Sequence, residues 1–315
     1  MNKINFNVKN KLIWNHLSIN KAMIIFFTVF YFLVTLALLS MGLIKYYDFV
    51  KFPYIAPTSI HAEIDNGHGS HGSYGIISWS IYSSLSTAIY SVPGITIFLI
   101  ANIYLINKII IKELNEGQIS IWMSFSFSRF KVIFSKILTI FIINLIIFSF
   151  SFILIIIFSS FAQDSKQYIG FVFMYSLQFI TFIILLVSIL IIFSILFNQK
   201  SVLLNVVFGL FIFWILSTWI LNLVYDLSDG TIKMLKYVKF ISPQSLLLPV
   251  MNFGSENVNL IEEYEYGKYK VTIKQATLKE VLWAIKSTVL ILLMISIVVI
   301  NYFSIRIFKN KDIKI

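Results

Sequence analysis

The 315-residue chain contains no cysteine, and charged residues make up only 12% of it. Without cysteine it can form neither a disulfide nor a thiolate nucleophile or metal ligand. Soluble domains carry about 25% charged residues, so an ordinary soluble fold is excluded. Glycine and proline are too scarce for a collagenous or low-complexity chain. The chain as a whole is 58% apolar and 17% aromatic, with a mean hydropathy of +0.87, which is typical of a polytopic membrane protein.

Six apolar stretches are long enough for helices that cross a hydrocarbon core, which needs about 20 residues. No polar–apolar alternation runs through them, which favours helices over an outer-membrane barrel. The sequence therefore predicts an all-α membrane protein, with one transmembrane domain over residues 1–315 and six transmembrane helices. The predicted spans are 22–44, 85–106, 137–161, 168–197, 202–224 and 282–305.

The basic residues predict the orientation, because cytoplasmic segments carry an excess of Lys and Arg. If the N-terminus is cytoplasmic, the whole net charge of +11 and both arginines fall on cytoplasmic segments. We therefore expect both termini on the cytoplasmic side of the cytoplasmic (inner) cell membrane. The same charge favours contact with anionic membrane lipid over nucleic-acid binding, since a basic surface alone is only an electrostatic footprint.

The segments outside the spans differ in length and character. Residues 1–21 resemble an interfacial helix, with an unstructured tail anchored by Trp14 as the alternative. Segments 45–84 and 225–281 are predicted outer loops, and 306–315 is predicted to be a cytoplasmic tail. The cytoplasmic loop 107–136 is the only inner loop long enough to bind a cytoplasmic partner.

Charges are missing from the interior of the spans. Such charges are costly and are kept for function, so ion-coupled transport is disfavoured, and Lys286, near an outer end, is expected to snorkel to the surface. Pro93-Gly94 predicts a kink or break that separates a Ser-rich segment, 76–91, from the second span. The polar residues inside the spans are expected to form interhelical hydrogen bonds; they are Asn102, Asn144, Gln178, Asn205, Asn222 and Asn301.

Enzymatic motifs are also missing. No glycine stands five residues before the Gly267-Lys268 pair, so the phosphate-binding P-loop is absent. No Ser-His-Asp, zinc-protease or redox pattern lies in an inner or intramembrane segment. The chain is therefore not predicted to be an enzyme by itself, and no catalytic residue or bound cofactor is assigned to it.

One inner segment resembles a known family. Residues 112–138, KELNEGQISIWMSFSFSRFKVIFSKIL, resemble the cytoplasmic loop of type-2 ATP-binding-cassette (ABC) transporter permeases. That family carries an acidic pair and Gly-Thr after its second span, then an apolar stretch, a Pro-x-Ser-Arg turn and a Lys seven residues after the Arg. The matching residues here are Glu113, Glu116, Gly117, Ser128, Arg129 and Lys136, whereas Gln118 and Ser126 depart from the usual Thr and Pro.

Two further stretches are similar to the same family. Ser242-Pro243 lies before the last span, where the family carries a Ser-Pro pair, and the chain ends in an aromatic and basic run, FKNKDIKI. The resemblance therefore extends over the whole six-span plan.

The resemblance implies a permease subunit, more commonly of an exporter, that couples ATP hydrolysis to translocation of a substrate. ATP and Mg²⁺ would bind to separate cytoplasmic ATPase subunits, and a second permease chain, identical or similar, would complete a dimer. A short helix in the loop would dock its apolar side in a groove of the ATPase. The expected docking residues are Glu113, Glu116, Gly117, Ile121, Trp122, Phe125 and Arg129.

Alternatives to this interpretation remain. The loop helix could be a lipid-anchored interfacial segment, and Lys136 is expected to contact lipid phosphates or to have a structural role. A non-transport membrane scaffold or a small channel is the alternative function.

A His-rich outer segment invites a metal-site hypothesis. His61, His68 and His71 lie close together in HAEIDNGHGSHG, residues 61–72. Their spacing matches no structural zinc site, and a short His-rich tract is only a compositional hint. The sequence therefore favours a solvated loop, with no metal site assigned.

Overall fold

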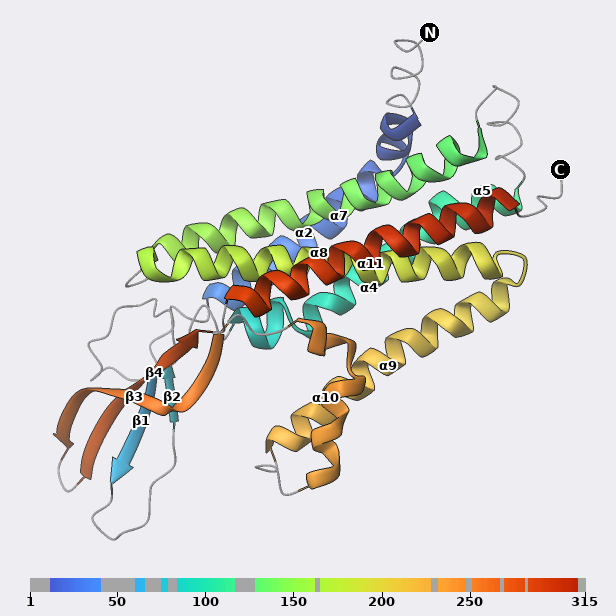
Figure 1. The fold of residues 1–315 in the computed structure, drawn as a ribbon. Helices are drawn as coiled ribbons and strands as arrows, with labels where there is room; N and C mark the ends of the chain where they lie inside the picture. Colours follow the sequence, from blue (N-terminus) through green and yellow to red (C-terminus); the bar gives the residue numbers. More distant parts are fainter. Residues whose placement is uncertain are drawn as a thin grey trace.

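The computed structural model describes most of the chain and is drawn in Figure 1. The described residues are 12–40, 60–65, 75–78, 84–116, 128–161, 165–227, 232–247, 251–266, 269–280 and 283–310.

Six helices are long and apolar enough to cross a membrane, as the sequence predicts. The chain is therefore a multi-pass helical membrane protein. The spans lie in α2 (Lys21–Ser40), α4 (Val92–Ile106) with its continuation to Asn115, α7 (Arg129–Ser160), α8 (Ser165–Phe197), α9 (Ser201–Leu227) and α11 (Trp283–Asn310).

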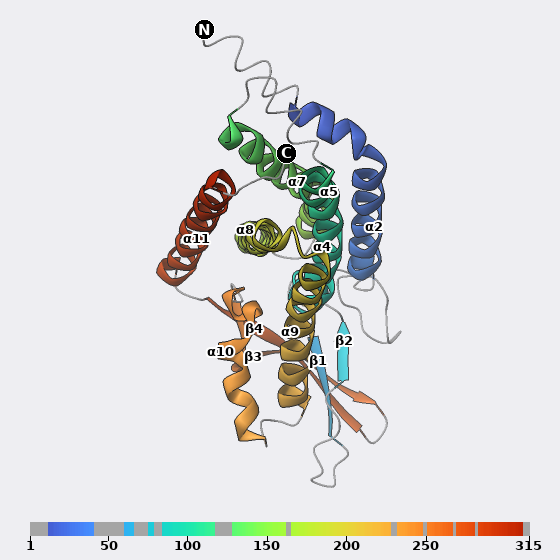
Figure 2. The same cartoon turned by 90° about the vertical axis from the view of Figure 1, so that its right-hand side faces the viewer.

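Helix α8 lies at the centre of the bundle. It packs against α4, α7, α9 and α11, and Figure 2 shows it between α11 on one side and α4 and α7 on the other. In its most apolar stretch 72% of the residues are buried, against 11% in α11. The outer helices therefore expose apolar faces, as expected for surfaces that lipid or another chain covers.

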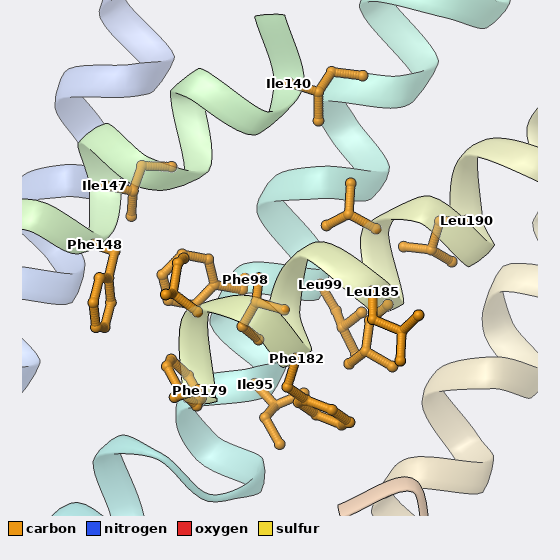
Figure 3. Packing of buried hydrophobic residues seen from close by; sticks show 14 of the residues in the cluster. Ile95, Phe98, Leu99, Ile140, Ile147, Phe148, Phe179, Phe182, Leu185 and Leu190 are labelled. Carbon is orange, nitrogen blue, oxygen red and sulfur yellow. The ribbon is translucent and has the colours of Figure 1, made fainter. Parts of the chain in front are cut away.

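The core forms where α4, α7 and α8 meet. Figure 3 shows Phe98 of α4, Phe148 of α7 and Phe179 of α8 directed into a common space. The rings of Phe98 and Phe148 each lie 5.9 Å from that of Phe179. Leu and Ile side chains of the same helices surround these rings and are fully buried. This core fixes the relative positions of the three helices.

The second span begins later than predicted, at the break that Pro93-Gly94 indicates. A π-helix, η2 (Leu85–Ile89), precedes α4, and Pro93 occupies the first turn of α4, where a missing N–H is tolerated. A Cβ on Gly94 would lie 1.9 Å from the carbonyl oxygen of Ile89. Only glycine allows η2 and α4 to approach this closely.

The described residues at both ends of the predicted cytoplasmic loop 107–136 are helical. A second π-helix, η3 (Asn107–Ile111), and α5 (Lys112–Asn115) continue α4, and α7 already begins at Arg129. The charges made these stretches resemble a loop. Within these helical ends, Lys136 and Glu113 are paired inside the protein. The first five residues of the predicted tail, 306–310, also belong to a helix, since α11 continues to Asn310.

The bundle is all-helical, as the sequence predicts, but strands that the sequence does not predict lie outside it. Four antiparallel strands form one sheet in the order β2-β1-β4-β3. Strands β1 (Ile60–Asp65) and β2 (Gly75–Ser78) come from the predicted loop 45–84, and β3 (Met251–Tyr266) and β4 (Tyr269–Glu280) from 225–281. The second segment also contains η4 (Lys233–Tyr237), α10 (Val238–Ile241) and η5 (Pro243–Leu246). Pairing of β1 with β4 joins two regions about 200 residues apart, which local patterns cannot predict.

Both ends of the described chain lie at one end of the bundle, opposite the sheet (Figure 1). Residues 12–19 are helical, which favours the predicted helix over an unstructured tail, and Trp14 is 70% exposed. We call this end the charged end. It comprises residues 12–20, α5, the first two turns of α7, the α8–α9 turn and the last turn of α11.

Candidate functional site

A buried ion pair joins the two helices that flank residues 117–127. The Nζ atom of Lys136, on α7, donates hydrogen bonds of 2.5 Å to Oε2 of Glu113, on α5, and to the carbonyl oxygen of Ile109, in η3. Lys136 is completely buried, and the Glu113 side chain is 12% exposed. The pair therefore fixes α5 and η3 to α7 at the charged end.

The π-helix η3 supplies part of this site. Local π-turns alter the regular α-helical hydrogen-bond pattern and are frequent at functional positions. Here η3 places the carbonyl of Ile109 and, one turn later, the carboxylate of Glu113 beside the same ammonium group. A charge buried without a partner is strongly unfavourable, whereas this ammonium has both a counter-charge and a carbonyl acceptor.

His16 attaches the N-terminal helix to the same pair. Its Nδ1 atom lies 3.5 Å from Oε1 of Glu113, and the residue is 3% exposed. Burial, and to a lesser degree the positive charge of Lys136, lower the pKa of His16 to about 4, although Glu113 acts in the opposite direction. His16 is therefore neutral near pH 7 and fits into the core beside the ion pair. Three elements meet at this cluster of His16, Glu113 and Lys136, which we call the ionic cluster.

The other predicted docking residues divide into two groups. Glu116 is largely exposed and lies 3.7 Å from Lys112 in an i, i+4 pair, and the Nη1 atom of Arg129 donates a 3.2 Å hydrogen bond to the carbonyl oxygen of Lys309, in the last turn of α11. Gly117, Ile121, Trp122 and Phe125 lie outside the described residues. Glu113 and Lys136 lie four residues before and nine residues after the segment 117–127 and contact each other, so Lys136 has the structural contact and not an exposed lipid contact.

The polar residues inside the spans form several of the expected interhelical contacts. The side-chain amides of Asn102, on α4, and Asn144, on α7, donate to each other over 2.7 Å, and both residues are fully buried. Asn301, on α11, donates to the hydroxyl of Ser188, on α8, and Gln178 donates to the carbonyl of Leu246. Lys286 does not extend to the surface, because it is buried with Nζ 4.6 Å from the ring centroid of Phe171.

The metal hypothesis gains no support among the residues that the structure describes. There, no group of three or more His, Asp or Glu side chains is close enough to hold a metal ion. His61 lies in β1, but His68 and His71 lie outside the described residues.

Sequence reasoning did not assign His16 a role. The available signal was its position beside Leu12, Ile13 and Leu17 on the apolar side of a helix, because a lone His on a packed side needs a partner. The partner, Glu113, lies 97 residues further along the chain, and only the fold brings the two together.

The structure is that of a multi-pass helical membrane protein in which a buried ion pair connects α5 to α7 at the charged end. No family model, curated protein or solved structure matches the chain.

Proposed function

We propose that the chain is the permease subunit of an ATP-driven ABC transporter of the type-2 class, and that it works as an exporter with both termini in the cytoplasm. The observation that best supports this proposal is the ion pair of Lys136 and Glu113, which joins both helical boundaries of the segment most similar to that family. The six apolar helices and the position of both ends of the described chain at the charged end are compatible with this topology.

The proposed mechanism follows from this connection. Separate ATPase subunits bind ATP and Mg²⁺ and contact residues 117–127 together with the exposed Glu116. Movement of that segment then shifts α4 and α7 together, because Lys136 holds η3 and α5 against α7. The permease responds by rigid-body movement of packed helices rather than by bending of one loop.

The proposed partner in the membrane is a second copy or a similar permease chain. Helices α2, α9 and α11 have low buried fractions and apolar exposed side chains, so the single chain offers surface for such a contact. A cavity between two chains would carry the substrate, whose identity the residues do not specify.

Co-purification tests the proposal. A tagged chain is extracted gently from its native membrane, and stoichiometric partners are identified by mass and sequence. We expect a soluble partner that contains a P-loop, lost from the double variant Glu116→Ala with Trp122→Ala. Trp14→Ala is the matched control, because Trp14 is an exposed Trp at the same end of the bundle but outside the segment.

Two outcomes of the co-purification would contradict the proposal. If the wild-type chain is recovered without an ATPase in several mild detergents, the permease proposal is wrong and the scaffold or channel alternative is favoured. Loss of the partner from Trp14→Ala as well would contradict docking at residues 117–127.

A further inference from the structure

A groove of about 560 Å³ lies at the charged end, where the end of α8 faces the last two turns of α11. Its apolar wall is formed by Leu196, Phe303 and Ile307, and its polar end by Arg306 and Asn310. Both Phe303 and Leu196 are about half exposed, so the groove opens on the surface that the membrane covers.

The groove-lining residues of α11 extend from the interior of the span to the end of the helix. Phe303, Ile307 and Asn310 follow at intervals of four and three residues and therefore share one side of the helix. Residues 303 and 310 are about 10 Å apart along the axis, at 1.5 Å per residue. Phe303 therefore lies deepest in the span, whereas Arg306 and Asn310 place a cation and an amide nearer the end of the helix, with Ile307 between them.

The charge of the rim favours an anionic ligand. Arg306 is one of only two arginines in the chain and forms no ion pair with any described residue, whereas Arg129 already donates to the carbonyl of Lys309. None of the groove-lining residues is acidic. A guanidinium group offers parallel N–H donors that fit two oxygens of one phosphate.

We propose that this groove binds one anionic glycerophospholipid, with its phosphate on Arg306 and Asn310 and an acyl chain along Phe303, Ile307 and Leu196. The lipid occupies the groove at the charged end and adds contacts between the end of α8 and α11, the least buried of the six described spans. This site does not depend on the transport function proposed above.

Native mass spectrometry of the full chain in detergent tests the site, with phosphatidylglycerol and phosphatidylcholine of identical acyl chains as probes. We expect tighter binding of phosphatidylglycerol. Arg306→Gln should weaken that binding roughly tenfold, which corresponds to about 1.4 kcal/mol, and should remove the preference. Phe303→Ala should weaken binding of both lipids, because the apolar wall contacts the acyl chain.

Lys21→Gln is the matched control for charge. Lys21 is an exposed cation at the same end but on α2, across the bundle from α11 (Figure 2). An equal loss in Lys21→Gln and Arg306→Gln would show a diffuse charge effect and overturn the proposal. Unchanged phosphatidylglycerol binding in Arg306→Gln, or in Phe303→Ala, would also overturn it. Because Arg306 and Phe303 are exposed, both variants are expected to keep the wild-type helicity, which circular dichroism checks.

Discussion

The charged end and the opposite half of the bundle hold their helices together by different interactions. At the charged end, α5 and α7 are joined by an ammonium, a carboxylate and a backbone carbonyl. In the opposite half, Tyr90 stacks on Phe179 at 4.6 Å, lies 5.1 Å from Tyr175 and shares a hydrogen bond with Ser176. We call this second group the aromatic cluster.

The two regions should differ in how much stability a single substitution removes. An ion pair is directional, and removal of one partner leaves a buried charge that is strongly destabilising. Aromatic contacts and a neutral hydrogen bond contribute smaller amounts that are spread over many atoms. Loss of a single charge at the charged end should therefore destabilise the folded protein strongly. A single substitution in the aromatic cluster should remove less stability.

Lys136→Met should give the largest effect. It leaves the Glu113 carboxylate without its partner, and we expect a loss of about 3–5 kcal/mol in the free energy of unfolding. Denaturation in mixed micelles measures this loss. The double variant Lys136→Met with Glu113→Gln should recover most of it, and failure of that recovery would mean that the pair is not the source of the effect.

Gly94→Ala should be the most damaging small substitution near the aromatic cluster. The added Cβ would overlap the carbonyl oxygen of Ile89, so η2 and α4 must separate, with a loss of about 2–3 kcal/mol. The same unfolding measurement applies. Gly209→Ala on α9 is the control, because a Cβ there meets no atom within 4 Å and should change little. Equal stability of the two variants would contradict the close approach.

Acidification should destabilise the protein through His16 at the charged end. The pKa of His16 is lowered in the folded protein, so the unfolded chain binds more protons, and stability falls as the pH decreases from about 6.5 toward about 4. Between pH 7 and pH 5 we expect a loss of about 2 kcal/mol. Unfolding at several pH values measures it, and His16→Phe should remove this component. A variant with the wild-type pH profile would exclude His16 as its origin.

Tyr90→Phe should give the smallest effect. It removes the hydroxyl that bonds Ser176 but keeps the ring against Phe179, so we expect a loss of about 1 kcal/mol. Tyr104→Phe, at a half-exposed position, is the control in the same denaturation experiment. A loss from Tyr90→Phe as large as that from Lys136→Met would remove the distinction between the two regions.

The spans could be predicted closely, because about 20 apolar residues in a row have few alternatives in a membrane. The predicted span 202–224 coincides with the structure, and 168–197 differs by one residue. The helix ends at the charged end could not be predicted, since Glu113 and Lys136 looked like surface charges until the fold paired them. The sheet was missed because β1 pairs with β4 over a long separation in sequence.

The sequence by itself determined that the chain has six helices long and apolar enough to span a membrane, because long apolar stretches without polar–apolar alternation favour the helix over the barrel, the other hydrogen-bonded form in lipid. It also determined the break at Pro93-Gly94, a local backbone effect. Only the tertiary structure decided that His16, Glu113 and Lys136 share one site and that Arg306 faces a groove. Those contacts join residues far apart in the chain, and their energies depend on burial, which local patterns do not encode.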